Sequence, residues 1–196
     1  MGSYNKKSIA RKVIRSKAFA KGAERRMASN LTKAKRIMVN EFDNHPVTRE
    51  ISQGPGGMNL TRSLGGYGNL FSFIGLEEDD SSVSKVRSLL MQIPKITGKK
   101  TSKNGISFTV SVPTVKDFRA VSRMPWEMGR SWVEGVETGI SGFSYYMGNL
   151  FGRNMNKSRS KTAIQADHEV RAGAFRPMPY MSEILRKFAI VMFRGA

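Results

Sequence analysis

The chain has no cysteine and only two histidines among its 196 residues. Without cysteine there can be no disulfide framework and no thiolate chemistry. Neither His45 nor His168 has a second histidine or a cysteine at metal-ligand spacing, which argues against a zinc site. His168 falls in an alternating apolar and polar segment, which favours a packed strand residue over a catalytic base.

Long apolar runs are also missing. No segment approaches the roughly 20 consecutive apolar residues that a transmembrane helix needs, so we expect no membrane partner. The length is sufficient for a hydrophobic core. We interpret residues 1–196 as a single domain, with a long helix over residues 6–42 and a sheet-based body over residues 47–196.

Catalytic patterns are absent as well. Ser131 and Ser141 lie outside any Gly-x-Ser-x-Gly context. The glycine-rich segments contain no Walker-type Gly-Lys-Ser/Thr and no Gly-x-Gly-x-x-Gly between a strand and a helix. The acidic run over residues 77–80 is better explained as a turn at the N-terminus of the next helix than as a metal site. We expect a protein that is not an enzyme and that uses no metal and no cofactor.

Acidic residues are scarce relative to basic ones, 15 against 33, so the formal net charge is +18. A charge of this size points to nucleic acid, an anionic surface or acidic protein neighbours as partners. Most of it lies at the start of the chain, where Glu24 is the one acidic residue among twelve cations between residues 6 and 36.

Residues 6–42 are predicted to form one long helix, because apolar residues recur mostly at spacings of three and four. Such a helix would be about 55 Å long, more than a core of this size requires, so part of it is expected to contact another chain. Gly22 would weaken its middle by about 1 kcal/mol and is expected to mark a bend. The apolar positions are Ile9, Val13, Ala20, Ala23, Met27, Leu31, Ala34 and Met38.

The cations of this helix form the first candidate interaction surface. Like charges at i,i+4 spacing repel by about 0.2–0.5 kcal/mol per pair, so negative charge from outside the helix is expected to compensate. A solvated helix face is the alternative. The candidate residues are Lys7, Arg11, Lys12, Arg15, Lys17, Lys21, Arg25 and Arg26.

The stretch over residues 47–76 contains two apolar-rich runs with the β-branched and aromatic content of strands, 47–52 and 70–74. Between them lies a glycine-rich excursion that is too long for a simple hairpin. Long ordered loops are usually functional, so we predict an interaction loop; a disordered surface loop is the alternative. Its candidate residues are Gly54, Pro55, Gly56, Gly57, Gly65, Gly66, Tyr67 and Gly68.

The rest of the chain predicts a small, mostly antiparallel sheet with helices, and therefore an α+β fold. The clearest strand covers residues 106–112, where apolar residues alternate with serine and threonine. Thr114 and Asp117 have the spacing of a capping box. The other expected elements are a helix over 83–92, a strand over 95–97, a helix beginning near Trp126, strands over 143–147 and 162–170, and a terminal helix over 181–193.

Four stretches carry a resemblance: VTREISQGP after the basic helix, GGYGNLFSFIGL, GRSWVEGVETGISGFSYYM, and AGAFRPMPYMSEIL near the end. Together they resemble the tail-completion, or neck, proteins of long-tailed bacteriophages. That family has a long N-terminal helix, a small antiparallel sheet and a proline–aromatic segment that enters a terminal helix. Arg176, Pro177, Pro179 and Tyr180 match this last feature and form the third candidate surface.

The resemblance implies a structural virion protein without catalytic activity, assembled in the host cytoplasm and located at the head–tail junction. Copies would form a ring, such as a hexamer or dodecamer, between the portal or adaptor and the tail tube or tail terminator, with DNA in the channel. The alternative from charge alone is a DNA-binding protein without sequence specificity that contacts phosphates.

Overall fold

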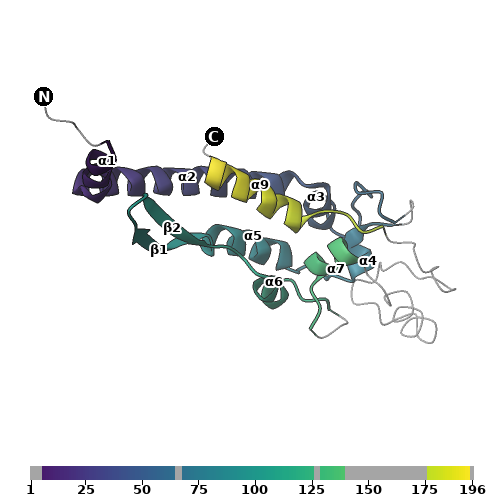
Figure 1. Ribbon diagram of the computed structural model, residues 1–196. Helices are drawn as coiled ribbons and strands as arrows, with labels where there is room; N and C mark the ends of the chain where they lie inside the picture. The colour runs from purple at the N-terminus through teal and green to yellow at the C-terminus, as the bar shows by residue number, and fades with distance from the viewer. Residues whose placement is uncertain (1–5, 65–67, 126–128, 140–175, 195–196) are drawn as a thin grey trace, which may run out of the picture.

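The computed structural model describes residues 6–64, 68–125, 129–139 and 176–194 (Figure 1). The described residues form an α+β arrangement, as the sequence predicts, with one two-stranded antiparallel sheet. None of the described helices is long and apolar enough to cross a membrane. The elements are α1 Lys6–Arg15, α2 Lys17–Asn44, α3 Pro46–Ser52, α4 Leu70–Ile74, α5 Ser82–Gln92, β1 Lys95–Thr101, β2 Ile106–Ser111, α6 Val115–Val121, α7 Trp132–Thr138 and α9 Met181–Arg194.

The second half of α2 is the centre of the core. Helices α5 and α9 both pack along it (Figure 1). Arg87 of α5 pairs with Asp43 at 2.9 Å, and Lys187 of α9 pairs with Glu41 at 2.6 Å. The buried side chains that meet here include Ala34, Met38, Phe42, Leu90, Ile184, Phe188 and Met192.

The predicted single helix over residues 6–42 is in fact two helices that divide at Ser16. Ser16 has an extended backbone, and its Oγ accepts a hydrogen bond from Phe19 N at 3.2 Å as the N-cap of α2. Serine favours such caps because its hydroxyl competes with the helical backbone bonds. Helix α2 continues through Gly22 without a break.

The predicted strand over residues 47–52 is wrong, because the segment forms helix α3. His45 ends α2, and its Nδ1 then accepts a hydrogen bond from Val47 N at 3.3 Å. Pro46 stands at the first helical position, where its fixed φ suits a helix and its missing N–H has no cost. Val47 and Ile51, one turn apart, are both buried. Capping and burial at helical spacing therefore outweigh the β-propensity of this segment.

The predicted strand over residues 70–74 is also wrong, because these residues form helix α4. Asn69 is its N-cap, with Oδ1 accepting from Ser72 N at 2.9 Å. Gly75 ends it in the left-handed conformation, with φ of 77°. The glycine-rich excursion therefore connects two helices rather than two strands of one sheet.

The hairpin β1–β2 confirms the strand predicted near residues 106–112 and its partner. Lys95 lies opposite Ser111, and Thr101 lies opposite Ile106. β1 is longer than the three residues expected, so it also contains Lys99 and Lys100. The helices α5 and α9 and the capping box at the start of α6 are confirmed. The helix expected to begin near Trp126 is α7, which begins only at Trp132. The strands expected over 143–147 and 162–170 lie outside the described residues.

His45 predicts a pH dependence of stability. Partial burial is the main cause that lowers the pKa of His45 below its ordinary value, and the neutral ring is the form that caps α3. Below about pH 6.5 the unfolded chain therefore binds a proton that the folded chain does not, so the free energy of unfolding should fall as pH decreases.

Asparagine at this position can still act as an N-cap but does not titrate. We expect thermal unfolding between pH 7.5 and 5.5 to show a smaller loss of stability for His45→Asn than for the unmodified chain. The other histidine is common to both proteins, so the difference isolates His45. Parallel pH profiles for the two proteins would contradict this assignment.

Candidate functional site

The N-terminal arm, defined as residues 6–33, has no core of its own. No residue between 9 and 33 is buried, and burial along α2 begins at Ala34. Figure 1 shows α1 and the first turns of α2 extending past the end of α9. Large apolar side chains on the arm remain exposed, namely Ile9 at 46%, Val13 at 49% and Phe19 at 40%. The arm therefore presents both apolar and basic side chains to its surroundings.

All of the candidate helix cations lie on this arm. Lys7 belongs to α1. The side chains of the other seven are exposed, which leaves them accessible to a partner: Arg11, Lys12, Arg15, Lys17, Lys21, Arg25 and Arg26.

The β1–β2 hairpin is a second basic element beside the arm, and the sequence analysis did not predict this position. Lys99 of β1 pairs with Glu24 of α2 at 2.5 Å. The pKa of Lys35 is lowered, first by burial and then by the nearby charge of Lys95, and its Nζ donates to Met91 O at 2.7 Å. The hairpin thus brings its lysines next to α2. The lysines were visible in the sequence, but their position beside the arm depends on the tertiary contacts.

The glycine loop over residues 53–69 is held by a buried carboxylate that the sequence analysis missed. The Glu50 side chain is fully buried. Its Oε2 accepts from Thr61 N at 2.7 Å, and its Oε1 accepts from Leu70 N at 2.7 Å. Glu50 therefore fixes the middle and the end of the loop to α3. An acidic residue in an apparent strand offers no local signal for this role.

Asn69 is the second anchor of the same loop. Its Nδ2 lies 3.1 Å from Gly54 O, 3.0 Å from Pro55 O and 2.8 Å from Gly57 O. The first part of the loop is therefore ordered by hydrogen bonds within the chain, which favours the ordered interpretation. An Asn before an apolar run is an N-cap signal that could have identified Asn69.

The candidate residues of the glycine loop differ in backbone conformation and exposure. Gly54 and Gly68 have φ of 72° and 67°, a region in which a side chain would be strained. Gly56 is exposed, and Pro55 and Gly57 are half-buried. Gly65, Gly66 and Tyr67 lie outside the described residues. The structure thus groups the first part of the candidate loop around Asn69.

The terminal segment divides into an exposed part and a buried part. Arg176, Pro177 and Pro179 are exposed, whereas Tyr180 is fully buried. The hydroxyl of Tyr180 lies 2.7 Å from Thr48 Oγ1. Its ring centroid is 4.7 Å from that of His45, 6.1 Å from Phe42 and 6.3 Å from Trp132. Burial raises the pKa of Tyr180, so the phenol stays neutral.

Backbone contacts fix the same segment to distant parts of the chain. Arg176 N donates to Ser63 O at 3.2 Å, and Met178 N donates to Val136 O at 3.1 Å. Glu137 Oε1 accepts from Tyr180 N at 3.1 Å. The segment therefore joins the glycine loop, α7 and the start of α9.

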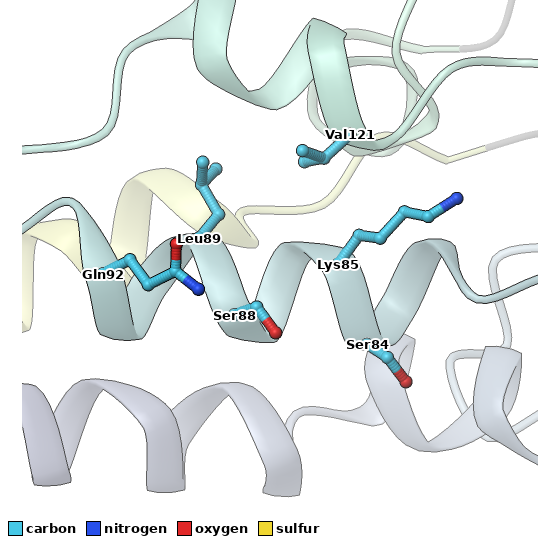
Figure 2. Close-up of a pocket in the computed structure, with 6 residues that line it drawn as sticks. All are labelled: Ser84, Lys85, Ser88, Leu89, Gln92 and Val121. Atoms are coloured by element: carbon cyan, nitrogen blue, oxygen red, sulfur yellow. The ribbon is translucent and has the colours of Figure 1, made fainter.

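An open groove of about 330 Å³ lies between α5 and α6 (Figure 2). Figure 2 draws Leu89 of α5 and Val121 of α6 on opposite sides of it. Among the described residues that line the groove, Lys85 is the one ionisable group, so these residues form no acid–base pair. Within the described part of the chain, no group of three or more acidic or histidine residues could hold a metal ion.

Comparisons of the chain with protein-family models, curated proteins and solved structures found no match.

Proposed function

We propose that this chain is a structural subunit of a phage head–tail junction. Copies form a ring, of six or twelve subunits, that contacts the portal or adaptor on one side and the tail tube or tail terminator on the other. The protein is non-catalytic, and its place is in the assembled virion. The similarity of its four sequence stretches to tail-completion proteins is the basis for the virion location.

The observation that carries the proposal is the N-terminal arm. No residue of the stretch 9–33 is buried by the described part of the chain, although Met27 and Leu31 pack partly against the core. Most stability of a protein helix comes from packing of its apolar face. Ile9, Val13 and Phe19 expose apolar surface that a neighbouring subunit would cover. A heterologous contact of this kind closes into a ring when the rotation between subunits permits it.

The oligomeric state is tested by measuring the mass of the purified chain at several concentrations, alone and with virion neck partners. We expect an integer multiple of 21.9 kDa to appear as concentration rises, and annular particles in negative-stain images. A chain that stays monomeric under all of these conditions would contradict the proposal.

The arm gives a sharper prediction. Changing Val13 and Phe19 together to serine should weaken self-association by about a hundredfold, because about 3 kcal/mol of apolar burial is lost. The change keeps the net charge, and serine has a helix propensity close to those of valine and phenylalanine. Sedimentation velocity across a concentration series measures the effect.

The matched control is Val115→Ser on α6, which alters an equally exposed apolar residue, at 55%, outside the arm. It should leave the association unchanged. Equal weakening by the control and by the arm variant would show that the arm has no special role.

Binding of nucleic acid without sequence specificity is the second candidate function. Its supporting observation is that hairpin lysines lie beside the cations of α2, as the contacts of Lys99 and Lys95 show. A basic surface built from two elements favours a polyanion over a single acidic side chain. Salt-dependent retention of a DNA duplex by the isolated chain would support it.

A further inference from the structure

Gly22 is a helical residue that no feature of the described part of the chain requires. Helix α2 continues through it, and a Cβ built there meets no atom within 4 Å. Glycine inside a helix is less favourable than alanine by about 1 kcal/mol. Neither its backbone conformation nor packing by the described residues accounts for this glycine, and the open space beside it permits close approach of another molecule.

Gly22 lies on the outward face of α2, the side opposite the core. At 100° per residue, the line opposite Ala34 and Met38 passes through Ala18, Gly22 and Ser29. These residues are small and exposed, so a partner could reach the helix backbone along this line. Cations lie on the same face, also exposed: Arg25, Arg26, Lys33 and Arg36.

This outward face carries charge of one sign only. Glu24 is the one acidic residue of α2 before Glu41, and it points to the hairpin, where it pairs with Lys99. A hollow of about 460 Å³ lies on the same face and is lined by Ser29, Thr32, Lys33 and Arg36. Two cations and a serine hydroxyl around a hollow are suited to a phosphate group.

We propose that the outward face of α2 from Lys17 to Arg36 docks on the phosphate backbone of double-stranded nucleic acid, and that Gly22 permits the close approach. The face is about 29 Å long, which matches about eight base-pair steps of 3.4 Å. This inference deepens the nucleic-acid part of the proposed function by assigning the face, and it does not depend on the ring.

The charge test uses two triple variants with the same net charge. Arg25→Gln, Lys33→Gln and Arg36→Gln alter the outward face, whereas Lys85→Gln, Lys116→Gln and Arg123→Gln alter exposed cations on or near α5 and α6. Fluorescence anisotropy with a 30-base-pair duplex is measured over a salt series. The outward-face variant should make the negative slope of log K against log salt shallower by about 2.7, and it should weaken binding by about tenfold or more at 0.1 M salt.

The control triple should change that slope by less than about one, since its charges act only at long range. Equal effects of the two triples would overturn the assignment of the face. Binding of poly-glutamate as tightly as the duplex, at the same salt concentration, would overturn the assignment of nucleic acid.

Gly22 provides a second test that does not change any charge. Gly22→Leu should raise the melting temperature, because leucine is a better helix former than glycine, yet weaken duplex binding by about tenfold because its side chain blocks the approach. Gly22→Ala should stabilise the helix and bind within about twofold of the unmodified chain. Ala120→Leu, at an exposed position of α6, is the matched control and should leave binding unchanged.

A Gly22→Leu protein that is more stable and binds duplex normally would overturn the role of Gly22. The mass of every variant is measured in parallel. A ring that persists while the outward-face variants bind duplex normally would overturn only this inference, whereas a monomer whose duplex binding depends on this face would overturn only the ring.

Discussion

Replacing Glu50 by alanine is expected to lower the free energy of unfolding by about 3–5 kcal/mol, because it leaves two backbone donors without their acceptor. The carboxylate is fully buried and accepts from Thr61 N and Leu70 N, each at 2.7 Å. Hydrogen bonds to a charged acceptor contribute about 1.5–3 kcal/mol each. Urea unfolding measures the loss.

Glu50→Gln tests the loss of one of these two hydrogen bonds while the other is kept. An amide keeps one acceptor oxygen but turns a donor toward the other backbone N–H, so we expect a smaller loss of about 1–3 kcal/mol. Faster hydrogen exchange should be concentrated at whichever of the two backbone amides, Thr61 or Leu70, faces the new NH2 group, since that amide loses its acceptor. The loop would then loosen while the core of α2, α5 and α9 persists.

The control for this series is Glu134→Gln. That carboxylate is partly exposed and pairs with Arg119 at 2.8 Å, so its loss should cost at most about 1 kcal/mol. Equal destabilisation by Glu50→Ala and Glu134→Gln would show that Glu50 does not organise the glycine loop.

Replacing Tyr180 by alanine is expected to lower the free energy of unfolding by about 3–5 kcal/mol, chiefly because the missing ring leaves a cavity. The ring is fully buried against Phe42, His45 and Trp132. Tyr180→Phe keeps the ring and removes only the hydroxyl bond to Thr48. We expect that change to cost about 1–2 kcal/mol.

A double-mutant cycle with Thr48→Val isolates the hydroxyl pair. If the bond matters, the two single changes should not add, because each already removes the same interaction. Additive losses in urea unfolding would show that the two hydroxyls act independently. The cycle also tests how the terminal segment is held, since Tyr180 is the part of that segment that packs in the core. Arg176, Pro177 and Pro179 are the exposed part of the segment.

Several features of this chain could be predicted from sequence because their signals are local. The apolar spacing of α5 and α9 and the Thr114–Asp117 capping box each lie within about four turns of helix. The alternation at residues 106–111 likewise identified the second strand of the hairpin. The basic character of the arm also follows from sequence, because charge does not depend on the fold.

The tertiary structure decided the features that depend on distant partners. Residues 47–52 and 70–74 have the composition of strands, yet caps at His45 and Asn69 and burial against the core made them helices. Glu50 finds its donors 11 and 20 residues away, and Tyr180 meets Thr48 across 132 residues. Sequence windows do not contain such pairs, because only packing in three dimensions determines which buried polar groups meet and which surface charges lie side by side.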